Sequence, residues 1–133
     1  MRIALVLAAL ALAITAPAGA HPAPFSFLDL HLDEAGLRGS IVLHDLDVAH
    51  DLEVEPPEQL LDPVVAGRHR ARLEALMDRR LELTVDNERR RLDWTSLEVV
   101  PERFGLRLSF AAGSRPSRVD IRAVVFPYDP VHQ

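Results

Sequence analysis

The sequence predicts a mainly β protein, a small β-sandwich of immunoglobulin-like type with one inserted α-helix. Three observations support this fold class. Apolar and polar residues alternate with a period of two in several segments, and turn-forming residues separate these segments at short intervals. Only the segment after residue 62 combines a helix start signal with a longer apolar stripe. Strands that are apolar on one face must bury that face against another layer, so a two-layer sandwich is the simplest arrangement.

The first two strands are predicted as a hairpin over residues 26–44. Leucines alternate with polar residues in the first strand; the leucines are Leu28, Leu30 and Leu32, and the polar residues are Asp29, His31 and Asp33. Glu34-Ala35-Gly36 forms the connection, and residues 37–44 form the returning strand. Residues 45–52 break the alternation, which indicates one helical turn, and Pro56-Pro57 marks a loop.

The inserted helix is predicted over residues 63–79. Asp62 followed by Pro63 is a favourable N-cap and first-turn pair, and an apolar stripe follows although Gly67 weakens its middle. Further strands are predicted at residues 81–85, 92–100, 104–110 and 119–125. A change of apolar phase between Trp94 and Leu97 indicates a β-bulge.

Residues 1–20 have the parts of a secretory signal peptide, whose apolar core we expect to be helical. Arg2 precedes an apolar run over residues 3–14, and small residues lead to a cleavage point after Ala20. This run is too short to span a bilayer comfortably, since a span needs about 20 apolar residues. We therefore expect a secreted or periplasmic protein whose extracytoplasmic domain covers residues 21–133.

Composition and motifs exclude several functions. The chain contains no cysteine, so it has neither a disulfide framework nor a thiolate metal site. Its formal net charge of −5 argues against nucleic acid, and against anionic lipid headgroups as the main docking surface. No nucleophile elbow, P-loop, dinucleotide-binding fingerprint or HExxH motif occurs, so we predict a domain that is not an enzyme.

Histidines and carboxylates predict a transition-metal site near the start of the mature chain. An N-terminal His21 would offer its α-amine and its imidazole to one metal. If the first two strands form a hairpin, His21 emerges near the end of the second strand, where His44, Asp47 and His50 follow. Imidazole and carboxylate ligands suit nickel, copper or zinc. The alternative is that His44 and His50 are ordinary polar residues at a sheet edge.

The remaining histidines and aromatic residues are interpreted as structural. His69 lies among arginines in the predicted helix, so we expect it on the solvated surface. Trp94, Phe104 and Phe110 fall at inward strand positions, so we expect them in the core.

Two stretches of the chain resemble a known family. The first begins at His21-Pro22-Ala23-Pro24-Phe25-Ser26 and ends with His44-Asp45-Leu46-Asp47-Val48-Ala49-His50-Asp51-Leu52; the second is Phe126-Pro127-Tyr128-Asp129-Pro130-Val131-His132-Gln133. Together they resemble the exported N-terminal domain of HupE/UreJ-like membrane proteins, a family named for hydrogenase and urease accessory factors. The resemblance implies a β-rich extracytoplasmic domain that is followed by a multi-helix membrane region, and handling of nickel or a related metal. We therefore expect residues 21–133 to be a domain truncated before such a membrane region. The matching motif positions are His21, His44, Asp45, Asp47, His50, Asp129 and His132.

Two functions remain open from the sequence. The first is an exported accessory domain that binds nickel or copper for a membrane transporter-like domain. The second is a metal-free interaction module that docks on a membrane domain or a neighbouring protein. An apolar patch of Val124, Phe126, Tyr128 and Val131 would support the second function. A copper oxidase built on an N-terminal histidine brace is the least supported alternative.

Overall fold

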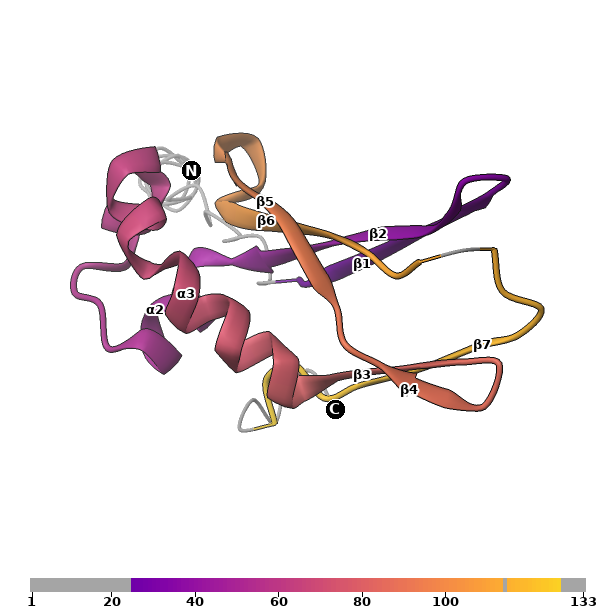
Figure 1. Ribbon diagram of the computed structural model, residues 1–133. Helices are drawn as coiled ribbons and strands as arrows, with labels where there is room; N and C mark the ends of the chain where they lie inside the picture. Colours follow the sequence, from indigo (N-terminus) through magenta and orange to yellow (C-terminus); the bar gives the residue numbers. More distant parts are fainter. Residues whose placement is uncertain (1–24, 114, 128–133) are drawn as a thin grey trace, which may run out of the picture.

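Two antiparallel sheets form the body of the protein in the computed structural model, which describes residues 25–113 and 115–127 (Figure 1). The larger sheet has the strand order β1-β2-β6-β5, and the smaller sheet has the order β4-β3-β7. The strands are β1 (Phe27–Asp33), β2 (Gly36–His44), β3 (Leu81–Val85), β4 (Glu88–Arg90), β5 (Asp93–Val100), β6 (Gly105–Ala111) and β7 (Val119–Ala123). The predicted mainly β fold, a small β-sandwich, is confirmed. The predicted signal peptide, residues 1–20, lies outside the described residues.

The helical segments lie together at one end of the sheets (Figure 1). They are α2 (Asp45–Leu52), the 3-10 helix η1 (Pro57–Leu61), α3 (Pro63–Arg80) and the short 3-10 helix η2 (Pro101–Arg103). The helix predicted over residues 63–79 is confirmed as α3, which starts because the Asp62 carboxylate accepts hydrogen bonds from the N–H groups of Val64 (2.7 Å) and Val65 (3.3 Å). Residues 45–52 form a helix of eight residues, longer than the single turn predicted there. Among the described residues, no helix combines the length and the apolar character needed to cross a membrane.

Two apolar clusters form the core. One joins α2, η1 and α3 to the larger sheet, and its fully buried members include Leu43, Leu73 and Met77. The other lies between the two sheets, and it contains Leu37, Leu81, Leu83, Val85, Leu92 and Phe110. The predicted bulge in β5 is confirmed, because the pairing of β5 with β6 shifts register between Trp94 and Ser96.

The larger sheet extends beyond the smaller one on the side of β1. Only residues 91 and 92 separate β4 from β5, so these two strands share the opposite side of the sandwich. Leu28 packs against both apolar clusters, which places the leucine face of β1 inward. However, Leu30 is 42% exposed and Leu32 is 52% exposed, so the prediction of a half-buried first strand holds only at its beginning. We call β1, with its exposed Leu30 and Leu32, the overhang.

Arg80 connects three parts of the fold at the end of α3. Its guanidinium pairs with both carboxylate oxygens of Asp51 in α2, one of them at 3.0 Å. It also donates to the carbonyl of Val125 at 2.6 Å and lies 5.7 Å from the ring centre of Phe126, both of which follow β7. One half-buried side chain therefore holds both helices and the segment after the last strand together.

Candidate functional site

The first hairpin has the geometry that the metal prediction required. β1 pairs antiparallel with β2, with Phe27 opposite Val42, so the start of β1 lies beside the end of β2 at His44. His21 lies outside the described residues, as do Asp129 and His132.

His44 is held by the carboxylate that follows it in the sequence. It is the N-cap of α2, and its ring Nδ1 lies 2.8 Å from Oδ1 of Asp45. The same carboxylate oxygen accepts the N–H of Leu46 at 2.8 Å. With the ring proton on Nδ1, the ring donates to Asp45 and its lone pair lies on Nε2; with the proton on Nε2, Nδ1 accepts the N–H of Leu46 at 3.3 Å as the N-cap of α2. Metal-binding histidines in proteins are commonly oriented by a carboxylate in this way. Both residues are buried, with exposed fractions of 8% for His44 and 3% for Asp45.

The other predicted ligands do not converge with His44 in the described part of the chain. Asp47 is buried within α2, whereas His50 is exposed on the same helix. Six positions separate His44 from His50, which places them on different sides of a helix that turns 3.6 residues at a time. Asp51 binds Arg80. Within residues 25–113 and 115–127, no group of three histidine or acidic side chains is placed to hold a metal ion.

Phe104 is not a core residue, and the prediction that placed it at an inward strand position is wrong. It follows η2, before β6 begins, and its backbone is left-handed with φ of 47°. Its carbonyl accepts the N–H of Asp45 at 2.7 Å, and its ring stacks on the ring of His44 with the centroids 6.3 Å apart. Its side chain is 49% exposed. By contrast, Phe110 is 2% exposed, and Trp94 packs edge-on against it at 5.6 Å, as expected for core residues.

Four exposed apolar residues lie at the end of the larger sheet where β1 begins and β2 ends at His44. We call Phe25, Phe27, Leu46 and Phe104 the aromatic patch; they are between 41% and 56% exposed. The rings of Phe25 and Phe27 lie 6.3 Å apart, and the guanidinium of Arg103 lies 4.9 Å from the ring centre of Phe27. The sequence holds a signal for this patch, because Phe27 occurs in β1 on the phase of Asp29 and His31, opposite the leucines.

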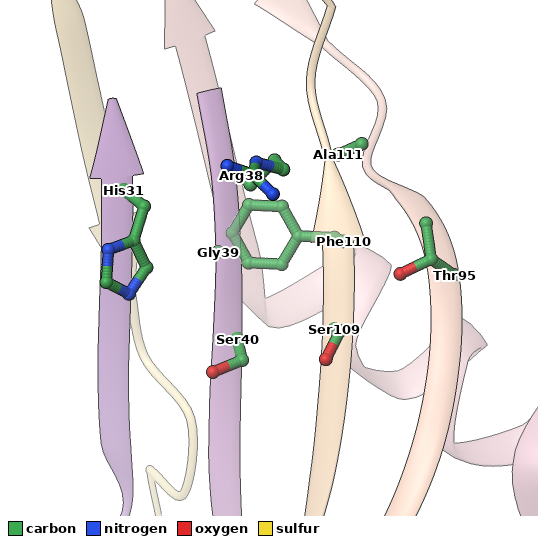
Figure 2. Close-up of a pocket in the computed structure, with 8 residues that line it drawn as sticks. All are labelled: His31, Arg38, Gly39, Ser40, Thr95, Ser109, Phe110 and Ala111. Atoms are coloured by element: carbon green, nitrogen blue, oxygen red, sulfur yellow. The ribbon is translucent and has the colours of Figure 1, made fainter. Parts of the chain in front are cut away.

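A shallow depression on the larger sheet is a weaker candidate for a ligand site than the surroundings of His44 (Figure 2). Its volume is about 470 Å³, and small residues of β2, β5 and β6 line it together with the ring of Phe110, with His31 and Arg38 at the side of β1 and β2. Arg38 is 63% exposed and is already paired with Asp33. The depression therefore has no buried charged group that would hold a ligand in place.

Two further predictions concern His69 and the apolar patch after the last strand. His69 was expected on the solvated surface, but it is only partly exposed, and its Nδ1 is buried without a hydrogen-bond partner among the described residues. The apolar patch predicted after the last strand is present only in part. Val124 is 48% exposed, Phe126 packs against the helical core cluster, and Tyr128 and Val131 lie outside the described residues.

Comparison of the chain with protein-family models, curated proteins and solved structures found no match.

Proposed function

We propose that this chain is an exported, non-enzymatic domain of HupE/UreJ-like type that works as an interaction module. In this proposal it docks through the aromatic patch onto a membrane domain or a neighbouring membrane protein. The observation that carries the proposal is the exposure of three phenylalanines and Leu46 in one place, each by at least 41%. Contiguous exposed apolar groups of this kind are typical of interaction sites.

The backbone under the patch supports this interpretation. A left-handed conformation is unfavourable for a bulky residue, and φ of 47° at Phe104 holds its ring outward over His44. The buried His44 and Asp45 fix this corner, because the Asp45 carboxylate lies 2.8 Å from Nδ1 of His44 and the Asp45 N–H donates to the Phe104 carbonyl. A strained residue that keeps an apolar ring at the surface is more easily explained by binding than by folding.

The chemistry of the patch favours a protein partner over a lipid surface. Aromatic residues and arginine are enriched at the centres of protein interfaces. Arg103 sits at the edge of the patch and forms no ion pair with any described residue, so it remains available to a carboxylate of the partner. The net charge of −5 opposes attraction to anionic lipids.

Site-specific photo-crosslinking tests this docking surface. A photoreactive phenylalanine analogue would replace Phe27 or Phe104 in the full chain, produced in cells that export it. We expect both positions to crosslink one membrane protein, and the additional change Leu46→Asp to abolish that crosslink. Val64 on α3, which is 64% exposed, provides the control position and should give no such product. Equal crosslinking from position 64, or crosslinks to lipid alone, would contradict the proposal.

Nickel or copper binding is a second candidate function, favoured by the His44–Asp45 pair. The described residues alone do not supply three ligands, so the predicted set also needs His21, which lies outside them. His44 would contribute Nε2, while Asp45 would orient the ring and strengthen its donor character.

Calorimetric titration with nickel, copper and zinc tests this second function. The chain beginning at His21 is compared with a chain carrying one additional residue before it. Binding that requires both a free His21 and an intact His44 would support the metal function, and no binding of any of the three metals would reject it.

A further inference from the structure

The overhang and the adjacent edge of the smaller sheet leave a place for one more strand. Leu30 and Leu32 share the inward face of β1 with Leu28, yet they are 42% and 52% exposed, and the smaller sheet has one strand fewer than the larger sheet. β7 is the last strand of the smaller sheet on this side. It pairs with β3 on one side, and no described strand pairs with the other. Open edges of this kind are ready to pair with another chain.

We propose that a second copy of this chain fills this place, so that the protein forms a two-fold dimer through β1 and β7. Each β1 would lie beside the β7 of the partner and beneath the partner's β1. Because the larger sheet exceeds the smaller one by a single strand, the two overhangs fit one another. A two-fold axis parallel to the strands pairs the β1 of each copy with the β7 of the other, and it also stacks the two β1 strands on each other. The same residues of both copies then meet, as an isologous interface requires.

The directions of the strands agree with this arrangement. β1 runs from the helical end of the molecule toward the hairpin tip, and β7 runs back toward the helical end (Figure 1). A two-fold axis along the strands preserves their directions, so the partner's β1 would be antiparallel to β7. Antiparallel pairing is the more stable kind.

The strand that fills the place must have apolar residues at alternate positions and an edge free for pairing. β1 itself meets both requirements, since Leu28, Leu30 and Leu32 alternate and no described strand covers its outer edge. In the dimer the leucines of the two β1 strands would pack against each other across the shared core. This burial would remove Leu30 and Leu32 from water in both copies.

Charge complementarity favours β1 over an unrelated strand. The outward residues of β1 include Asp29 and Asp33, of which Asp33 is paired with Arg38. The outer face of β7 presents Asp120, which is paired with Arg118, and Arg122, which lies opposite Glu82 of β3. Asp29 and Arg122 are exposed, and neither forms an ion pair with a described residue. With the leucines inside, Asp29 of one copy lies on the same face as Arg122 of the other.

Measurement of the molar mass in solution tests the dimer. The full chain, purified after export, would be examined by light scattering and sedimentation velocity over a range of concentrations. We expect a dimer, and we expect the double change Leu30→Glu and Leu32→Glu to raise its dissociation constant by about 100-fold or more. Leu46→Glu is the matched control, because Leu46 is 50% exposed but belongs to the aromatic patch. That variant should remain dimeric.

A charge exchange provides a second test that leaves the apolar residues in place. Asp29→Arg and Arg122→Asp should each weaken the dimer, and the two changes together should restore it. If the leucine variant fails to fold, the Asp29→Arg and Arg122→Asp variants still test whether the dimer forms through β1 and β7. A monomer at every concentration would overturn the proposal, as would a dimer that survives the leucine and charge changes or is lost through Leu46→Glu. None of these outcomes depends on the crosslinks expected from Phe27 and Phe104.

Discussion

Replacing Gly39 by alanine should destabilise the fold, because the space for a single methyl group is already filled. A Cβ atom at Gly39 would lie 2.4 Å from Cζ of Phe110, 2.9 Å from the carbonyl oxygen of Asp29 and 2.9 Å from Cδ2 of Leu30. Figure 2 shows the ring of Phe110 lying across Gly39 from the neighbouring strand. Phe110 is 2% exposed, and the Asp29 oxygen belongs to the backbone of β1, so neither can move away freely.

The expected size follows from two opposing effects. Overpacking a core typically costs about 1–3 kcal/mol of unfolding free energy. Alanine regains about 0.5–1 kcal/mol relative to glycine within a regular element. The net expectation is a loss of about 1–2 kcal/mol, or a urea midpoint lower by about 1 M for a domain of this size.

Gly67→Ala provides the matched control for this experiment. Gly67 is exposed within α3, and a Cβ atom there would meet nothing within 4 Å. The same chemical change should therefore raise the unfolding free energy by about 0.5–1 kcal/mol. Urea unfolding would be followed by the fluorescence of Trp94, the only tryptophan, and by circular dichroism. The reasoning is refuted if Gly39→Ala is as stable as the original chain while Gly67→Ala gains stability.

Three further predictions concern polar interactions. Asp62→Ala should cost about 1 kcal/mol in urea unfolding by removing the N-cap of α3, and Asp62→Asn should retain most of the stability. Asp51→Asn should cost about 2–3 kcal/mol, since it leaves the half-buried Arg80 without its carboxylate, and the added change Arg80→Met should recover part of the loss. The hydrogen bond from Arg38 lowers the pKa of Asp33 in the folded protein, so its stabilising effect should be present above the unfolded-state pKa and disappear as the pH falls through the folded-state pKa. In a carboxyl NMR titration Arg38→Ala should raise the pKa of Asp33, and an unchanged midpoint would show that the hydrogen bond does not set it.

Local patterns were sufficient to predict most elements of this fold. Asp62 and Pro63 mark the start of α3 because the cap satisfies the first N–H groups of the helix within the same segment. The alternation in residues 81–85 corresponds to β3, whose inward residues are buried. The exposure of Leu30 and Leu32 could not be predicted in this way. Alternation shows that they share a face with Leu28, but not how many strands the facing sheet contains.

The candidate site was harder to predict because it depends on backbone conformation and on distant contacts. Phe104 has the spacing of Leu106, Leu108 and Phe110, but spacing carries no information about its left-handed φ. His44 and His50 are close in sequence, and the helix between them separates their side chains. The proximity of Phe27 to Arg103 joins residues more than seventy positions apart, and no local pattern reports such a contact.

The position of Arg80 has a consequence for the lifetime of the folded state. Its partners Asp51 and Val125 lie 29 and 45 residues away along the chain, so these bonds form only when α2, α3 and the segment after β7 have come together, which is expected late in folding. Interactions that form after the folding transition state slow unfolding and leave the folding rate nearly unchanged. Slow unfolding limits how often proteases meet an open chain. The Arg80 contacts would therefore act mainly as a kinetic barrier to degradation.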